Sequence, residues 1–198
     1  MDYTNMRLGL ISDTHMPGAA LDDSRELPKQ VIKAFENVEM ILHVGDIYAS
    51  SCLDWLEHHI APVCAVEYAK ASLITDDPRV EEKRVLELEG YRIGMVHDFH
   101  AQGLPEEPIE GAIERYRARN GNLSVKKISE DFFGAPVDIV IFGHTHDRMI
   151  EEHDGVLLVN PGSPVLPSQM RRLGTVGILE ISKGSRHAKI INLVDIDV

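Results

Sequence analysis

The chain has few cysteines, little aromatic content and no long hydrophobic run. Its two cysteines, Cys52 and Cys64, stand in no C-x-x-C arrangement, which argues against a disulfide framework and a cysteine zinc site and is typical of a reducing compartment. The apolar run from Leu8 to Ile11 is too short for a secretory signal or a membrane span. We therefore expect a soluble cytoplasmic protein without a membrane partner.

Basic residues are also scarce, because 20 Lys and Arg face 32 Asp and Glu, and the formal net charge is −12. A broad basic surface for nucleic acid is therefore not expected. A small site for a phosphate ester remains compatible with this charge, because bound cations reverse the potential locally. The length of 198 residues, without a repeat or a linker, predicts one domain that spans 1–198.

Apolar runs and turn residues predict an α/β chain. Short strands alternate with helices in the first half, as in a sheet with helices packed outside it, and later strands form hairpins around turn residues. The predicted strands are 7–12, 40–44, 63–66, 84–88, 91–96, 137–141, 149–153, 156–160, 175–181 and 188–194. A helical segment, 105–134, forms most of an insertion at about 101–136. The second half therefore suggests two stacked sheets.

Acids and histidines follow four separate apolar strands. They are Asp13 with His15, Asp46, His97, and His144 with His146. One such group alone is commonly turn chemistry, because Asp accepts hydrogen bonds from nearby backbone donors. Ligands of open α/β sheets bind outside the carboxyl ends of the strands, so four groups can converge there. Carboxylate and imidazole suit Mn, Fe, Zn or Ni, and the repetition favours a metal centre.

The sequence resembles the calcineurin-like metallophosphoesterase family, especially its small single-domain phosphodiesterases. The motifs that carry the resemblance are LISDTH (10–15), HVGD (43–46), His97, GHTH (143–146) and NPGSP (160–164), in the family's order. The resemblance implies a four-layer α-β-β-α sandwich of two mixed β-sheets flanked by helices. It also implies a metal-dependent phosphodiesterase or phosphatase that hydrolyses a small phosphate ester with a metal-activated water as nucleophile.

The resemblance further implies two divalent metal ions, with Mn favoured and Fe, Ni or Zn as alternatives. The family's metal ligands match Asp13, His15 and His146 for the first ion, His97 and His144 for the second, and Asp46 as the bridge between them. Residues near the site that orient ligands or substrate are expected at Asn160, Ser163, Asp98 and His100.

One position departs from the family pattern. The family has Gly-Asn after its third strand, and the Asn side chain binds the second metal. Alignment of residues 62–71 places Tyr68 and Ala69 there, and alanine offers no donor atom. Asp98, His100 or Glu67 are the candidates to replace it. Without a replacement, the second metal site is expected to be weaker and only partly occupied.

Replacing Ala69 with asparagine is expected to raise metal occupancy and phosphodiesterase turnover while leaving the fold intact, because the missing donor is restored. Elemental analysis and the rate on a model diester check this expectation. If neither quantity rises, the alignment of this segment is wrong.

Two questions stay open at this level. The fold also resembles that of a retromer subunit in which the metal site has decayed and the surface binds proteins, so a degenerate scaffold is the alternative to an enzyme. The helical segment 105–134 is compatible with a lid over the metals, a contact in a homo-oligomer, or a plain pair of packed helices.

Overall fold

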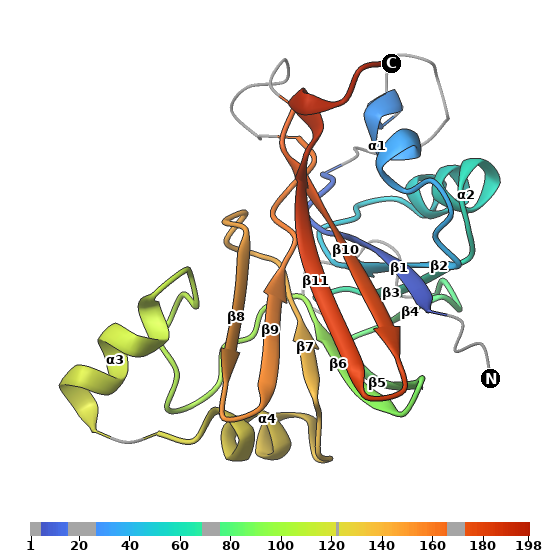
Figure 1. Cartoon of the computed structure of the whole chain (residues 1–198). Coiled ribbons are helices and arrows are strands. Elements are labelled where there is room, and N and C mark those ends of the chain that lie inside the picture. Colours follow the sequence, from blue (N-terminus) through green and yellow to red (C-terminus); the bar gives the residue numbers. More distant parts are fainter. Residues whose placement is uncertain (1–4, 16–26, 69–75, 122, 166–172) are drawn as a thin grey trace.

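The computed structural model describes residues 5–15, 27–68, 76–121, 123–165 and 173–198. Ala69 lies outside this part, so the prediction made for it stays a prediction. Strands β1 to β11 form two sheets (Figure 1). The six-stranded sheet has the order β11 (Ser185–Asn192), β10 (Thr175–Ser182), β1 (Met6–Ile11), β2 (Met40–Val44), β3 (Val63–Val66) and β4 (Val80–Glu81). The five-stranded sheet has the order β5 (Lys83–Leu88), β6 (Tyr91–Val96), β7 (Ile139–Ile141), β9 (Val156–Asn160) and β8 (Met149–His153).

Both sheets are mixed, as predicted. In the first, β1, β2, β3 and β4 are parallel, and β10 and β11 join as an antiparallel hairpin at the β1 edge. In the second, β6, β7 and β9 are parallel, and β5 and β8 pair antiparallel at the two edges. The loops that leave β1, β2, β6 and β7 consequently start at carboxyl ends of parallel strands, where ligands of such sheets bind.

Helices cover the outer faces and complete the four layers. Helices α1 (Lys29–Ala34) and α2 (Ser50–His59) lie beside the six-stranded sheet, and α3 (Ala112–Asn120) and α4 (Val125–Phe133) beside the five-stranded one (Figure 1). A 3₁₀ helix, η2 (Leu193–Asp195), directly follows β11. Within the described residues, no helix has the length and apolar character needed to cross a membrane.

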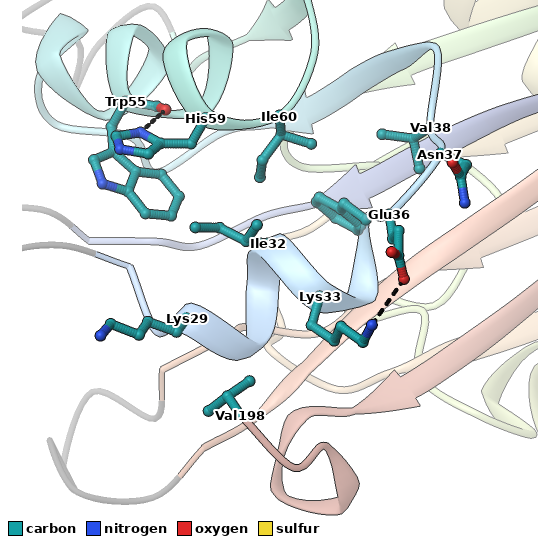
Figure 2. Close-up of a pocket in the computed structure, with 11 residues that line it drawn as sticks. Lys29, Ile32, Lys33, Glu36, Asn37, Val38, Trp55, His59, Ile60 and Val198 are labelled. Carbon is teal, nitrogen blue, oxygen red and sulfur yellow. Dashed lines mark hydrogen bonds and ion pairs between the residues drawn. The ribbon is translucent and has the colours of Figure 1, made fainter.

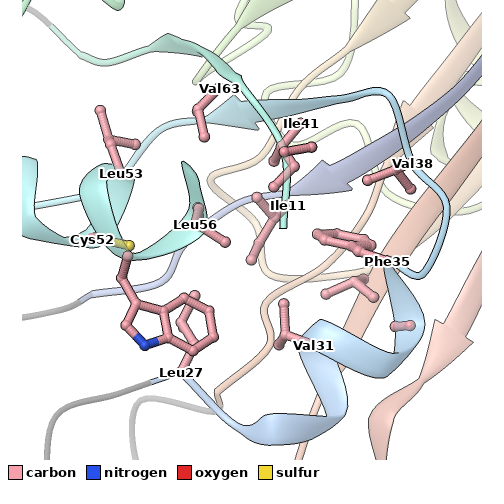
Figure 3. Packing of buried hydrophobic residues seen from close by; sticks show 14 of the residues in the cluster. Ile11, Leu27, Val31, Phe35, Val38, Ile41, Cys52, Leu53, Leu56 and Val63 are labelled. Carbon is pink, nitrogen blue, oxygen red and sulfur yellow. The ribbon is translucent and has the colours of Figure 1, made fainter. Parts of the chain in front are cut away.

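Side chains along a strand point alternately to the two faces of its sheet, and they fill the core layers on both faces. Leu8 and Leu10 of β1 pack between the sheets with Ile139 and Ile141 of β7, whereas Ile11 points to the other face and packs under α1 and α2 (Figure 3). These side chains are fully buried, and each such burial contributes about 1.5–3 kcal/mol relative to exposure. Residues two apart on a strand face the same layer, so the period of two in the sequence encodes the sandwich.

The helical segment differs from its prediction at its start. Helix α3 begins at Ala112 rather than near residue 105, because Gly111 has a φ of 73° and cannot continue a helix. Helix α4 begins after Ser124, whose side chain accepts a hydrogen bond from the backbone N–H of Lys127. Both helices place buried side chains, Ile113 and Val125, in the outer core of the five-stranded sheet.

Candidate metal centre

The loops that carry the candidate ligands are joined by backbone hydrogen bonds. The N–H groups of Asp13 and His15 donate to the carbonyls of Gly45 and Asp46, each at 2.9 Å, which ties the β1 loop to the β2 loop. In the second sheet, the N–H of Gly143 donates to the carbonyl of His97 at 2.9 Å. Residues far apart in the sequence are therefore held at one end of the two sheets.

Four of the six candidate ligands form a compact group. One ligand atom from each of Asp13, His15, Asp46 and His146 lies within 4.8 Å of the others. The Nε2 atoms of His15 and His146 face each other at 3.0 Å. Nε2 of His146 lies 3.2 Å from Oδ1 of Asp13, and Nε2 of His15 lies 3.6 Å from Oδ2 of Asp46. The arrangement directs two imidazoles and two carboxylates at a common point.

The carboxylate of Asp13 provides a test of whether these residues fit a metal ion. Its side chain is completely buried. Oδ2 lies 2.5 Å from the hydroxyl of Ser12 and accepts from the backbone N–H of His144 at 3.2 Å. Oδ1, in contrast, is buried and makes no hydrogen bond of good geometry, although Nε2 of His146 lies 3.2 Å away. A buried carboxylate oxygen without such a bond is unfavourable unless a cation satisfies it, so this donor set fits a divalent ion.

Asp13 and His146 also change each other's protonation. Burial opposes ionisation of Asp13, but His146, His97 and Ser12 together outweigh it and hold the pKa of Asp13 below its usual value. The contact with Asp13 in turn raises the pKa of His146. The carboxylate is thus charged at neutral pH, as a metal ligand must be.

The remaining two candidate ligands, His97 and His144, lie outside the compact group. Nδ1 of His97 lies 2.8 Å from the carbonyl oxygen of Val44, to which it can donate, and this leaves Nε2, 3.7 Å from Oδ2 of Asp46, free to bind a metal. His144 is exposed, and its ring centroid lies 5.4 Å from that of His97. Asp46 therefore lies between His15 and His97, whereas His144 is the more exposed of the two remaining candidates.

The backbone is strained at the candidate ligands. Nine non-glycine residues of the described chain have a positive φ, and five of them are Asp13, His15, Asp46, His144 and His146, with φ between 47° and 69°. Side chains with a Cβ are unfavourable in this region, and such strain persists where the surrounding structure enforces it. Five of these nine strained residues thus gather at one end of the sheets, where the candidate ligands lie.

Two glycines permit the close approach of these loops. A Cβ at Gly143 would overlap the hydroxyl of Ser12 and lie 2.7 Å from Oδ2 of Asp13. A Cβ at Gly45, where φ is 100°, would overlap the ring of His97. The glycines that precede His144 and Asp46 in the sequence are thus explained by packing against other ligands.

Glu67 has a structural role that the sequence did not indicate. Its buried carboxylate accepts hydrogen bonds from backbone donors at both oxygens. Oε1 accepts from the N–H groups of Asp46 and Tyr68, and Oε2 accepts from that of Ile47, at 2.8–3.1 Å. Glu67 therefore holds the loop after β2 against the loop after β3, and no local sequence signal distinguishes this role.

Asn160 and Ser163 lie beneath the same loops and are both buried. The Asn160 amide donates to the Gly143 carbonyl at 2.9 Å, and the Ser163 hydroxyl lies 2.7 Å from the carbonyl of Asp13. These contacts orient backbone that carries candidate ligands. Asp98 is half-buried and His100 exposed, and both line a cavity beside His97 rather than the compact group.

His43 is buried behind the site and is neutral. The N–H of Gly45 donates to its Nδ1 at 3.2 Å, so Nε2 carries the proton and faces the hydroxyl of Thr14 at 3.2 Å. Burial lowers the pKa of His43 to about 3. This side chain supports the loop after β2 and is not among the residues that could bind the metal.

The depressed pKa of His43 predicts a loss of stability in acid. In the unfolded chain the imidazole binds a proton near pH 6.5, so below that pH the unfolded state takes up more protons and the free energy of unfolding falls. Between pH 7 and pH 5 we expect a contribution of about 2 kcal/mol. Urea denaturation of the wild type and His43→Asn at both pH values measures it. An equal pH dependence in the two proteins would contradict the assignment.

A cavity elsewhere in the fold does not contain this chemistry. It has a volume of about 670 Å³ and lies between α1 and α2, where Ile32, Trp55 and Ile60 form much of its wall (Figure 2). His59 stacks on Trp55 there, with ring centroids 4.7 Å apart. None of the candidate ligands lines it.

The chain is similar to known proteins over most of its length. Residues 6–184 match the calcineurin-like phosphoesterase superfamily domain. A protein of Methanothermobacter thermautotrophicus named probable metallophosphoesterase is 34% identical over 163 residues, which are 82% of this chain and 79% of that protein. A phosphodiesterase of Methanocaldococcus jannaschii is 26% identical over 192 residues, with 90% and 95% coverage.

A solved structure has a similar fold. Vacuolar protein sorting 29 from Cryptosporidium parvum superposes with a TM-score of 0.61 at 20% identity, with coverage of 96% of this chain and 98% of that one. At this identity the similarity concerns the fold alone. The sequence match over most of the chain carries the assignment: the protein belongs to the calcineurin-like phosphoesterase superfamily.

Proposed function

We propose that this protein is a metal-dependent phosphoesterase that hydrolyses a small phosphate ester, with a diester as the favoured substrate class. The observation that carries the proposal is the compact group of Asp13, His15, Asp46 and His146, with ligand atoms within 4.8 Å of one another. The similarity over 90% of the chain to a phosphodiesterase supports the choice of a diester.

The proposed metal ligands form two sets that share one carboxylate. The first ion would be held by Asp13, His15 and His146, the second by His97 and His144, and Asp46 would contact both. Mn suits this donor set, and Fe, Ni or Zn are compatible with it. Two bound cations would neutralise phosphate oxygens and bring the pKa of a water molecule close to neutrality.

The chain's own contribution is to prepare the ligands. Ser12 and the N–H of His144 occupy one oxygen of Asp13, which directs the other oxygen into the site. The carbonyl of Val44 fixes the ring of His97 so that its free nitrogen faces Asp46. Preorganised ligands of this kind are oriented by their hydrogen-bond partners before the metal arrives.

The test is a set of hydrolysis assays with each divalent metal in turn. The substrates are bis(4-nitrophenyl) phosphate as the diester, 4-nitrophenyl phosphate as the monoester, and single-stranded DNA. We expect metal-dependent release of nitrophenolate, faster from the diester, and no cleavage of DNA, because the net charge of −12 disfavours a polyanion. Elemental analysis of the same sample reports the metal content.

The scaffold alternative makes the opposite prediction. The likeness to vacuolar protein sorting 29 concerns the fold, and the exposed position of His144 is the feature of the site that agrees best with a weakened second metal. A folded protein that hydrolyses none of the substrates with any divalent metal would favour the scaffold over the enzyme.

A further inference from the structure

Two cavities flank the candidate metal centre, and they differ in character. One shares His97 with the centre, has a volume of about 500 Å³, and is lined by the acids Glu82 and Asp98 together with aromatic side chains. The other shares His146, has a volume of about 440 Å³, and is lined by the acids Glu110 and Asp147 but by no Phe, Trp or Tyr of the described residues. Arg148 also lines this second cavity, but its guanidinium donates to Asn192 at 2.7 Å.

The cavity beside His97 has aromatic walls. Tyr68 and Phe132 line it together with Lys83 and His100. The ammonium of Lys83 donates to the carbonyl of Phe132 at 2.6 Å and lies 5.1 Å from the centre of the Phe132 ring. The aromatic ring and the cation are therefore fixed to each other, and the volume lies within the range of small-molecule sites.

The side chain of Tyr68 is exposed, although a hydrogen bond anchors its backbone. Of the Phe, Trp and Tyr side chains in the described part of the chain, Tyr48 and Tyr68 are the exposed ones, at 38% and 42%. Both follow ends of parallel strands, β2 and β3, at the metal centre. The N–H of Tyr68 donates to Glu67 at 2.8 Å, and the same carboxylate holds the loop of Tyr48. An exposed ring on an anchored backbone offers a stacking surface at little entropic cost.

From these observations we propose that the cavity beside His97 binds a planar aromatic ester group of the substrate, which stacks on Tyr68. The inference rests on the proposed phosphoesterase function and specifies its substrate class. The phosphate lies at the metal centre, and its aromatic substituent extends past His97 toward Tyr68 and Phe132. An aryl ester and a nucleotide share this chemistry, because both carry a flat ring attached to the phosphate.

Binding of non-hydrolysable ligands tests the proposal without reliance on turnover. Calorimetry on the Mn-loaded protein compares phenylphosphonate with cyclohexylphosphonate, which matches its size, and with methylphosphonate. We expect phenylphosphonate to bind about tenfold more tightly than the other two, the usual effect of one ring stacked on an aromatic side chain. Adenosine 5′-monophosphate against ribose 5-phosphate shows whether a nucleobase occupies the cavity as well as a phenyl ring does.

Variants of Tyr68 locate the effect. Tyr68→Ala should abolish the tenfold preference, Tyr68→Phe should retain it, and Tyr116→Ala on α3 should leave it unchanged because Tyr116 does not line the cavity. Thermal denaturation of each variant shows that the fold is kept.

The possible results separate the two proposals. Equal affinity for the three phosphonates, or a preference that survives Tyr68→Ala, overturns the aromatic subsite, and turnover of the diester by the same sample leaves the phosphoesterase proposal standing. A preference for phenylphosphonate without turnover of any ester supports the subsite and overturns the hydrolase. Absence of both binding and turnover overturns both.

Discussion

Replacing Asp46 with asparagine is expected to remove most of the bound metal and to lower diester hydrolysis at least about 100-fold. Oδ2 of Asp46 lies 3.6 Å from Nε2 of His15 and 3.7 Å from Nε2 of His97, so this one carboxylate serves both proposed ions. Removal of a residue that only hydrogen-bonds to a metal ligand reduces metal affinity or activity about 10–100-fold. Removal of a ligand that two ions share should have a larger effect. Elemental analysis and the rate on bis(4-nitrophenyl) phosphate measure the two effects.

A surface aspartate provides the control for this change. Asp131 on α4 forms an exposed ion pair with Lys127 and is not among the candidate ligands. Asp131→Asn should therefore keep metal content and turnover, and should alter the free energy of unfolding by less than about 1 kcal/mol. Asp46→Asn with full metal content would show that the carboxylate is not a ligand, even if its activity were low.

The second large effect is expected at Gly45. A Cβ there would overlap the ring of His97, and φ at this position is 100°. Gly45→Ala should therefore destabilise the fold by about 2–5 kcal/mol, from the unfavourable backbone together with the overpacking. Because His97 must move to accommodate the methyl group, metal content should fall as well. Urea denaturation and elemental analysis report the two quantities separately.

A substitution at Gly90 measures the cost of the backbone conformation without the cost of the steric overlap. The φ of Gly90, 83°, is also positive, but nothing lies within 4 Å of the position of a Cβ, and it occupies the turn between β5 and β6. Gly90→Ala should cost about 1–2 kcal/mol, the backbone term alone, and leave the metal in place. If the two variants lose equal stability and equal metal, contact with His97 is not the reason for glycine at position 45.

The strands illustrate what local patterns encode. The predicted bounds 40–44, 63–66, 149–153 and 156–160 coincide with β2, β3, β8 and β9. Turn residues bound three of these strands, because Gly45-Asp46 follows β2 and Asp154-Gly155 joins β8 to β9. The hairpin of β10 and β11 was less well predicted. Ser182 pairs with Ser185, so the turn is Lys183–Gly184 and β11 begins three residues before the predicted strand at 188.

The helical segment shows where local reasoning fails. Hydrophobic spacing from Ile109 onward resembles a helix, yet the left-handed Gly111 delays α3 to Ala112. A glycine in the sequence does not predict the local conformation, because it adopts both helical and left-handed backbone. Which of the two it adopts depends on how the segment docks against the five-stranded sheet, and that docking involves residues distant in the chain.

The sequence by itself determined the two-sheet architecture and the identity of the candidate ligands, because side-chain period and strand-end chemistry are properties of neighbouring residues. Only the tertiary structure decided how those ligands are used. The carboxylate of Asp13 is oriented by the backbone of His144, 131 residues away, and the loop of Asp46 by Glu67, 21 residues away. Orientation and burial depend on contacts across the fold, and a linear pattern does not contain the distances between segments that make those contacts.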